Sequence, residues 1–328
     1  YPLNVKIISF LSAKKEKIVW QFLPWKEIIT KYDVVFVSGN PRVLSDVVLG
    51  TLLRLMRKRV VLWTMAHSYR GNKLTENIRL LWSRIFQNIF VYTDKEVEYL
   101  REKGFRNHYI LAMNNGLDQK IIDSIVSKWT EEKITKWMEL HDYQNRKIII
   151  SCARLEKKNN FGLVIEALPE IVQKIPNLLW FLIGGGDEEE NLKELAGKLE
   201  VEKYVVFLGA IYEEEELAPY FLSSKLFIHP AAIGLSLLHA FGYGIPVIVH
   251  DQIDLHGPEY AAFENDITGK TFRFNDSDDL ANVIISLLNN PKEINKMKIN
   301  VQKIAREQYN VDIMVDRFIQ MAKFAANK

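Results

Sequence analysis

The feature of this sequence that most constrains its fold is a regular alternation of two kinds of segment. Short runs rich in branched and aromatic residues, typical of buried strands, alternate with longer segments in which apolar residues recur at helical spacing. The predicted strands are residues 5–11, 33–38, 59–64, 89–93, 108–112, 147–152, 178–184, 204–209, 225–229, 245–249 and 271–274. The predicted helices are 43–56, 74–88, 95–103, 161–174, 189–200, 213–222, 235–243, 277–289, 292–308 and 311–324. This alternation favours an α/β fold of doubly wound parallel sheets, with helices on both faces.

The alternation stops near residue 140 and restarts at 147, which indicates two domains. A length of 328 residues also favours two domains over one. We therefore expect an N-terminal Rossmann-like domain over 1–145 and a second one over 146–310. A last helix, 311–328, is a candidate to pack back on the first domain.

Composition excludes several classes of protein. The contents of 48% hydrophobic and 26% charged residues exclude disordered and coiled-coil chains. A single cysteine, Cys152, excludes a disulfide framework and a cysteine zinc cluster, and it suits a reducing compartment. The longest apolar run, 47–56, is broken by Arg54, so no membrane span is expected. The sequence opens on Tyr1 without a signal-peptide pattern; we expect a cytoplasmic protein, or a piece of one.

Charge is distributed unevenly between the two halves. Residues 1–145 hold 23 Lys and Arg against 15 Asp and Glu, whereas residues 146–328 hold 20 against 26. The basic first half suggests an anionic partner, such as the inner face of the plasma membrane or a phosphorylated acceptor. The densest cluster is Arg54, Arg57, Lys58 and Arg59, which a solvated helix end also explains. Nucleic acid is not expected, because no basic stripe with interleaved aromatic residues is present.

Polar residues that follow the strands are the candidates for chemistry, because ligands of doubly wound sheets sit beyond the carboxyl ends of the strands. Arg154 and Lys158 follow strand 147–152, and their charges suit a diphosphate. Gly184 and Gly185 lie where strand 178–184 ends and permit close approach of a ligand, although a plain strand-to-helix turn is the stronger explanation of these glycines alone. Gly234 begins a helix with Leu235 and Ser236, and the free amides of a helix start attract anions.

These residues, together with Gly244-Ile245-Pro246-Val247, resemble the group 1 (family four) glycosyltransferases of the GT-B fold. The resemblance implies two Rossmann-like domains facing a cleft, the second holding a UDP- or GDP-sugar and the first presenting the acceptor. It implies that Arg154 and Lys158 bind the donor diphosphate. It also implies that the helix start at Gly234, Leu235 and Ser236 contacts the donor phosphate and sugar, beside the glycines after strand 178–184.

The sequence departs from the family at two glutamates, which are usually spaced by seven residues. The first lies beside the donor sugar and the second holds the ribose hydroxyls, but Ala231 and His239 stand in those places here. A ring nitrogen of His239 can still bind the ribose, whereas Ala231 can make no hydrogen bond through its side chain. We expect Glu259 or His256, which follow the next strand, to take over part of this work, with a solvent-facing turn as the alternative.

The first half supplies the remaining candidates. The resemblance places His67, at the end of strand 59–64, close to the donor sugar and acceptor, as a catalytic residue. Asn40 and Arg42 follow strand 33–38 and are expected on the acceptor side, together with Asn115. The glycine-rich first loop common in the family is not visible. Either this strand and loop are missing from the sequence, or the subgroup dispenses with them.

The expected function is transfer of a sugar from a nucleoside diphosphate sugar to a saccharide or lipid-linked acceptor. The resemblance implies retention at the anomeric carbon, no cofactor, and a product among surface polysaccharides or glycolipids. The pair Asp276 and Asp278 matches a metal-binding Asp-x-Asp by its letters, but it is predicted to cap a helix, so no metal is expected. A Gly-x-Ser-x-Gly hydrolase motif is absent. The alternatives are a sugar-nucleotide epimerase, a phosphorylase, or a degenerate donor-binding subunit, which Ala231 and His239 favour.

Overall fold

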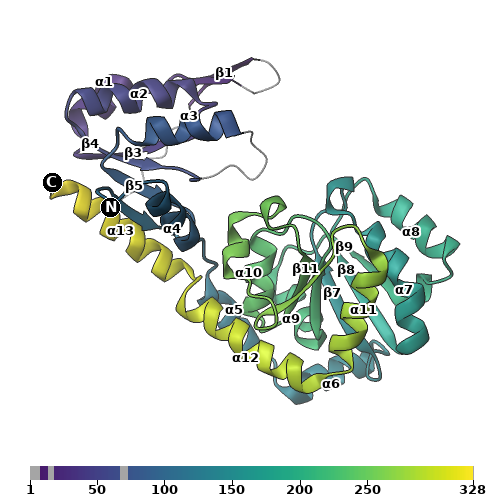
Figure 1. Ribbon diagram of the computed structural model, residues 1–328. Coiled ribbons are helices and arrows are strands. Elements are labelled where there is room, and N and C mark those ends of the chain that lie inside the picture. The colour runs from purple at the N-terminus through teal and green to yellow at the C-terminus, as the bar shows by residue number, and fades with distance from the viewer. Residues whose placement is uncertain (1–7, 14–17, 67–72, 328) are drawn as a thin grey trace. The chain divides into compact units, whose positions relative to one another are not determined.

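The computed structural model describes residues 8–13, 18–66 and 73–327. The chain forms two compact units, one of Tyr1–Asn114 with Met314–Lys328 and one of Asn115–Ile313, and each holds its own parallel sheet (Figure 1). The sequence placed the domain boundary at residue 145, whereas this division falls at residue 114. The difference arises from α5 (Gln119–Val126) and α6 (Glu131–Leu140), whose apolar residues pack in the core of the second unit.

The sheet of the first unit has four parallel strands in the order β3-β4-β5-β6. Its strands are β3 (Val34–Ser38), β4 (Arg59–Trp63), β5 (Asn88–Val91) and β6 (Tyr109–Ala112), and they alternate with α2 (Leu44–Leu55), α3 (Lys73–Ser83) and α4 (Asp94–Glu102). Leu62 and Ile89 point toward the clusters formed with these helices, whereas Val61 and Phe90 point to the opposite face. Both faces of the sheet are therefore apolar, and helices must pack on both to shield them from water.

The C-terminal helix α13 (Val311–Ala326) covers the second face of this sheet. The Phe318 ring lies 5.4 Å from Phe36, 5.2 Å from Trp63 and 4.6 Å from Phe90, measured between ring centroids. Arg317 Nη1 donates to Asp94 Oδ1 at 3.0 Å and to the carbonyl of Ala112 at 3.1 Å. The first unit is thus completed by a segment from the far end of the chain.

The predicted strand 5–11 does not open the parallel sheet. Of its described residues, Phe10 and Leu11 belong to β1 (Phe10–Ala13), which pairs antiparallel with β2 (Ile18–Gln21) in a separate two-stranded sheet. All four residues of β1 are exposed, so this strand lacks the two buried faces that a central parallel strand has. The sequence also missed α1 (Trp25–Lys31), which follows this hairpin.

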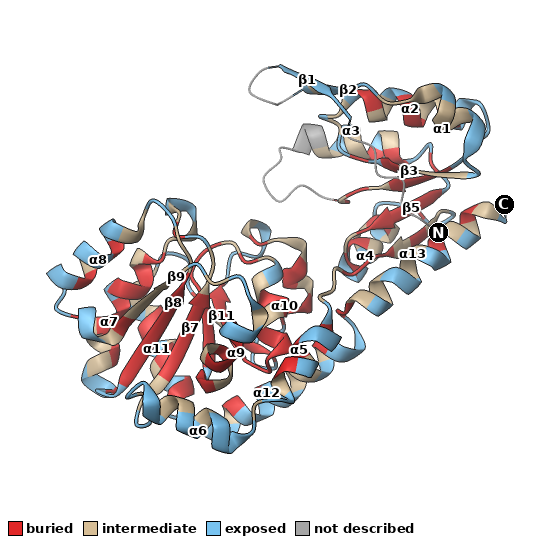
Figure 2. Cartoon of the chain, turned by 180° about the vertical axis from the view of Figure 1, so that it is seen from behind, coloured by how far each residue is buried: buried red, intermediate tan, exposed pale blue. Residues whose placement is uncertain are grey.

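The second unit has a six-stranded sheet in the order β12-β11-β10-β7-β8-β9, with every neighbouring pair parallel. Its strands are β7 (Lys147–Cys152), β8 (Leu178–Ile183), β9 (Val205–Gly209), β10 (Leu226–His229), β11 (Val247–His250) and β12 (Gly269–Phe272), and most of their residues are buried (Figure 2). One face packs against α7 (Gly162–Lys174), α8 (Glu189–Lys198) and α11 (Ser277–Leu288). The other packs against α5, α9 (Glu214–Ser223), α10 (Leu235–Gly242) and α12 (Pro291–Glu307). The predicted doubly wound α/β fold is confirmed.

The order of these strands reverses between β7 and β10. From β7 the chain builds outward through β8 and β9, and it then returns to β10 and builds outward on the other side. The ladder between β7 and β10 ends at Ile150 and Phe227, and beyond it Ser151 Oγ donates to the carbonyl of Ile228 at 2.7 Å. The connections leave this point in opposite directions, which opens the crevice where ligands of doubly wound sheets bind.

Candidate functional site

Two cations predicted to bind a diphosphate come together after β7. Arg154 Nη1 lies 3.5 Å from Glu156 Oε1, and Lys158 Nζ lies 2.5 Å from Glu156 Oε2. Lys158, and then Arg154, hold the pKa of the Glu156 carboxyl below its usual range. The side chains of Arg154 and Lys158 remain 81% and 71% exposed, so both stay accessible to an anion. Glu156 contacts both cations and so holds them in one place, and it was not predicted from the sequence.

The glycines after β8 allow two loops to pack backbone to backbone. Gly184 has φ +149°, and a Cβ there would overlap the carbonyl of Ala153; a Cβ on Gly186 would overlap the carbonyl of Leu155. The amide of Leu155 donates to the carbonyl of Gly185 at 3.0 Å. These contacts fix the loop that carries Arg154, so close backbone packing already accounts for the glycines.

The helix start predicted at Gly234 has no side-chain cap. Gly234 is the N-cap of α10 and supplies no side-chain hydrogen bond, so the first amides of the helix, on Leu235 and Ser236, are left for solvent or a ligand. Glu259 is buried beside it: a Cβ on Gly234 would lie 3.6 Å from Glu259 Oε2. Asn115 Nδ2 donates to Glu259 Oε1 at 2.6 Å, so Asn115, expected on the acceptor side, lies in the second unit with Glu259.

His256 has no ring nitrogen left for a ligand. Its Nδ1 accepts from the amide of Ile233 at 3.2 Å, and its Nε2 donates to the carbonyl of His250 at 2.9 Å. The ring is buried between His250 and Tyr260, at centroid distances of 4.0 and 4.2 Å, and burial lowers its pKa. His256 therefore fastens the loop before Glu259, and with both ring nitrogens engaged it is less suited than Glu259 to take over the work of a lost glutamate.

His239 faces a carboxylate that sequence analysis did not single out. His239 Nε2 lies 2.8 Å from Glu214 Oε1, and Tyr243 Oη donates to the same oxygen at 2.5 Å. Burial raises the pKa of the Glu214 carboxyl, but the bonds from His239 and Tyr243 outweigh it and the pKa is lowered. No sequence signal separates Glu214 from its acidic neighbours, because its partners come from another helix. Ala231 is buried and brings no polar side chain.

In the first unit, the loop that carries Asn40 and Arg42 lies at the carboxyl edge of the sheet. Asn40 Oδ1 accepts from the amide of Arg42 at 3.1 Å, and the preceding Gly39 abuts Thr64 at the end of β4. Arg42 is exposed. His67, expected at this edge, lies outside the described residues.

The two aspartates considered for a metal have other surroundings. Asp276 caps α11 as predicted: its Oδ1 accepts from the amide of Asp279 at 2.8 Å, and its Oδ2 lies 3.0 Å from Arg273 Nη2. Asp278 is exposed. Over residues 8–13, 18–66 and 73–327, no group of three His, Cys, Asp or Glu side chains is arranged to hold a metal ion.

The basic cluster lies where α2 ends and β4 begins, at the amino edge of the sheet. Arg54 Nε donates to the carbonyl of Ile85 at 2.8 Å, and the neighbouring Leu55 is 77% exposed. Among the described helices, none is long and apolar enough to cross a bilayer.

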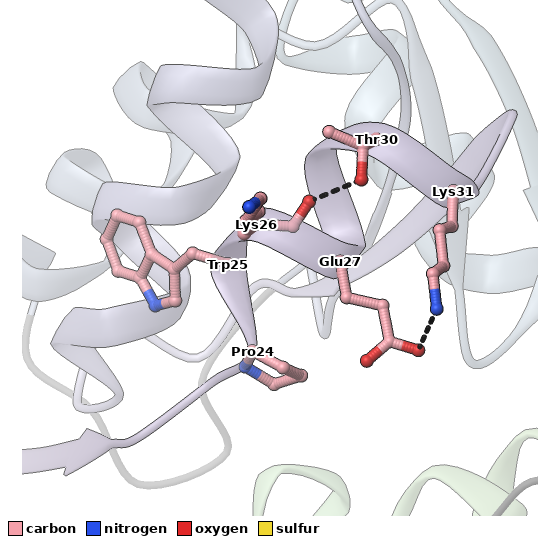
Figure 3. Close-up of a pocket in the computed structure, with 6 residues that line it drawn as sticks. All are labelled: Pro24, Trp25, Lys26, Glu27, Thr30 and Lys31. Carbon is pink, nitrogen blue, oxygen red and sulfur yellow. Dashed lines mark hydrogen bonds and ion pairs between the residues drawn. The ribbon is translucent and has the colours of Figure 1, made fainter.

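Two hollows in the described structure are lined by other residues, apart from Glu156. One, of about 440 Å³, runs along α1 and is lined by Pro24, Trp25, Lys26, Glu27, Thr30 and Lys31 (Figure 3). Lys31 Nζ lies 3.7 Å from Glu27 Oε1, and Thr30 Oγ1 donates to the carbonyl of Lys26 at 2.7 Å. The other, of about 200 Å³, lies between the starts of α7 and α8 and includes Glu156. Neither contains a predicted site residue.

Comparison with known proteins identifies the family. Residues 134–304 match the family model described as "Glycosyl transferases group 1". The chain is 24% identical over 192 residues to the alpha-monoglucosyldiacylglycerol synthase of Acholeplasma laidlawii, covering 56% of this chain and 46% of that enzyme. It is 27% identical over 143 residues to the GDP-mannose-dependent alpha-(1-6)-phosphatidylinositol monomannoside mannosyltransferase of Mycolicibacterium smegmatis, covering 40% of this chain and 35% of that enzyme. The chain thus spans less than half the length of these two relatives.

The fold is also that of a solved structure. The chain superimposes on Anabaena HepE in complex with UDP with a TM-score of 0.70 and 17% identity, covering 93% of this chain and 82% of that one. The predicted GT-B architecture of two Rossmann-like units is confirmed. With its family match centred on the unit that holds Arg154, Gly234 and Glu259, the chain belongs to the group 1 glycosyltransferases.

Proposed function

We propose that this chain transfers a sugar from a nucleoside diphosphate sugar to a hydroxyl group of a glycan or lipid-linked acceptor. The observation that carries this proposal is the pairing of Arg154 and Lys158 around Glu156, at the end of β7. Arg154 and Lys158 follow β7 and the open start of α10 follows β10, the two strands that flank the switch point of the family-matched unit. HepE in complex with UDP, and a relative described as GDP-mannose-dependent, favour UDP or GDP as the nucleotide.

In this reaction the protein mainly provides electrostatic stabilisation of the leaving diphosphate. The acceptor hydroxyl oxygen bonds to the anomeric carbon as the bond from that carbon to the diphosphate oxygen breaks. The diphosphate leaves with the electron pair of that bond, gains negative charge, and takes up the hydroxyl proton. Arg154, Lys158 and the amides of Leu235 and Ser236 stabilise that charge in this account, without a metal ion or other cofactor. We propose that the anomeric configuration is retained, as the family resemblance implies.

The donor sugar is proposed to lie between the glycine turn and the start of α10. Gly184 and Gly185 line one side, and Gly234 lines the other. Glu259 stands next to Gly234, and Asn115 orients its carboxylate. Glu259 thus supplies a hydrogen-bond acceptor beside the start of α10, whereas the side chain of Ala231 supplies none.

Asn40 and Arg42 are proposed to bind the acceptor, and His67 to act close to the donor sugar and the acceptor. Two relatives carry a lipid in their names, the alpha-monoglucosyldiacylglycerol synthase and the phosphatidylinositol monomannoside mannosyltransferase, which favours a lipid-linked acceptor over a free sugar. The exposed cations near Arg57 and the exposed Leu55 suit an anionic membrane surface. We propose a cytoplasmic enzyme that works at the inner face of the plasma membrane in surface polysaccharide or glycolipid synthesis.

The first test is Arg154→Ala, with Lys157→Ala as its control. Lys157 is an exposed neighbour of the same charge that forms no ion pair with Glu156. Removing a group that stabilises transition-state charge costs on the order of 100-fold in kcat. Sugar transfer by Arg154→Ala should fall by that factor, while Lys157→Ala stays near wild type and both unfold at the wild-type temperature. A normal kcat in Arg154→Ala contradicts this assignment.

A second test addresses the metal ion. Transfer that relies on Arg154, Lys158 and helix amides should persist in excess EDTA. Activity that disappears in EDTA and returns with Mn²⁺ or Mg²⁺ would show that the diphosphate needs a bridging cation. Nucleotide-sugar binding without transfer to any acceptor would favour the alternative function, a donor-binding subunit, which Ala231 and His239 suggest.

A further inference from the structure

Residues 213–216 are four consecutive glutamates, and Glu214 is the one whose side chain is partly buried. Glu213, Glu215 and Glu216 are exposed, whereas the side chain of Glu214 is only 27% exposed. Glu215 pairs with Lys128 at 2.5 Å on the surface. The run therefore combines ordinary surface carboxylates with a half-buried one that has different partners.

Two side chains of α10 hold the Glu214 carboxylate on one oxygen. His239 Nε2 and Tyr243 Oη both contact Oε1, at 2.8 and 2.5 Å. Burial and the bond to Glu214 raise the pKa of Tyr243, so its hydroxyl remains a donor. Within the described part of the chain, Oε2 has no hydrogen-bond partner and remains available as an acceptor.

Glu214 lies near the carboxyl end of β7. Cys152 is the last residue of β7, and its thiol has a pKa raised to about 11 by burial and by the charge of Glu214. Helix α9 begins after the carboxyl end of β9 and packs in one cluster with Ile150 and Cys152 of β7. Its first residue, Glu214, therefore lies at the carboxyl edge of the sheet, where β7 leads to Arg154. In parallel-sheet nucleotide sites, an acidic side chain near a strand end binds the hydroxyls of the ribose.

We propose that Glu214 binds the ribose hydroxyls of the nucleoside diphosphate, with His239 and Tyr243 as the residues that position it. This inference rests on the proposed function, because it needs a nucleotide at the switch point. His239 then does not contact the ribose itself, since its Nε2 is committed to Glu214. The carboxylate comes from α9, whereas the family's ribose-binding glutamate would be residue 239 of α10.

The test compares UDP with 2′,3′-dideoxy-UDP by calorimetry, or the matching GDP pair if GDP binds more tightly. A hydrogen bond to a carboxylate contributes about 10- to 100-fold to affinity. Glu214→Gln should lower the affinity for UDP by that factor, and it should change the affinity for dideoxy-UDP by less than about threefold. Glu215→Gln, the matched control, should change neither. A glutamine carbonyl still accepts from His239 and Tyr243; if this variant unfolds, Glu214→Asp carries the same comparison.

A rescue variant separates a ribose contact from a structural role. In Glu214→Gln combined with His239→Glu, a carboxylate is restored next to the position of Glu214, from α10, and the preference for UDP over dideoxy-UDP should recover. Equal losses for the two nucleotides in Glu214→Gln, or no loss for either, overturn the role of Glu214 and leave the proposed function standing. Wild-type protein that binds neither UDP nor GDP overturns the proposed function and this inference with it.

Discussion

His229 and His250, at the carboxyl ends of β10 and β11, are buried with 3% and 0% of their surface exposed. Burial, and next to it the nearby His256, lowers the pKa of His250 to about 4; burial likewise lowers that of His229 to about 4. His229 Nδ1 donates to the carbonyl of Ala231 at 3.2 Å, so the neutral ring has a defined place in the fold. These histidines support the strand ends of the site as uncharged groups.

The pH dependence of stability follows from those pKa values. Between pH 6.5 and about 4, the unfolded chain binds a proton at each histidine and the folded chain does not, so the free energy of unfolding falls as the pH falls. Above pH 6.5 this loss is absent. Between pH 6.5 and pH 4, His229 alone should lower the free energy of unfolding by on the order of 3 kcal/mol.

Urea unfolding at pH 7.5 and pH 4.5 checks this expectation. His229→Asn keeps a donor near the position of Nδ1 and removes the titration, so its stability should fall less on acidification than that of wild type. His141→Asn, at an exposed position, should follow wild type. An identical acid dependence in wild type and His229→Asn would show that His229 is protonated in the folded state.

At the scale of elements, α13 stabilises the first unit by covering the sheet face formed by Phe36, Trp63 and Phe90. Phe318→Ala removes the ring that contacts all three, and it should lower the free energy of unfolding by about 2–4 kcal/mol, because a cavity is left in a packed aromatic cluster. Ile319→Ala, one residue further on an exposed face, should cost less than about 0.5 kcal/mol. Denaturant titration of both variants measures the difference; equal effects would show that α13 does not cover that face.

The elements that the sequence predicted well are those with strong periodicity. Strand β7 has the predicted bounds, and α7 and α10 differ from prediction by one residue at one end, because buried strands and amphipathic helices leave a local pattern. The hairpin β1–β2, α1, α5 and α6 were missed. Their apolar residues are few or pack on distant parts of the chain, so no pattern within one window indicates them.

The site residues also divide into those that a local sequence pattern indicates and those that depend on contacts between distant segments. Arg154, Gly234 and Glu259 were predicted because each follows a strand, and all strands of a parallel sheet end at one edge. Glu156 and Glu214 were not. The partner of Glu214, His239, stands 25 residues further along the chain on another helix, and only the packed structure brings the two side chains together.

At the scale of the whole molecule, the predicted nucleotide site lies entirely in the second unit, Asn115–Ile313. The positive charge of Arg154 and Lys158, the open start of α10 and the buried Glu259 all belong to that unit. The family match, over residues 134–304, falls in it as well. Nucleotide binding is therefore a property that this unit should carry within the full chain.

The most direct measurement of this claim is hydrogen–deuterium exchange of the full chain with and without saturating UDP or GDP. We expect slower exchange in three segments that follow β7, β10 and β11 at the carboxyl edge of the sheet: residues 153–160, 230–239 and 256–260. Exchange in residues 18–66 of the first unit should be unchanged by the nucleotide alone. Slowing confined to the first unit, or no slowing with either nucleotide, would contradict the account.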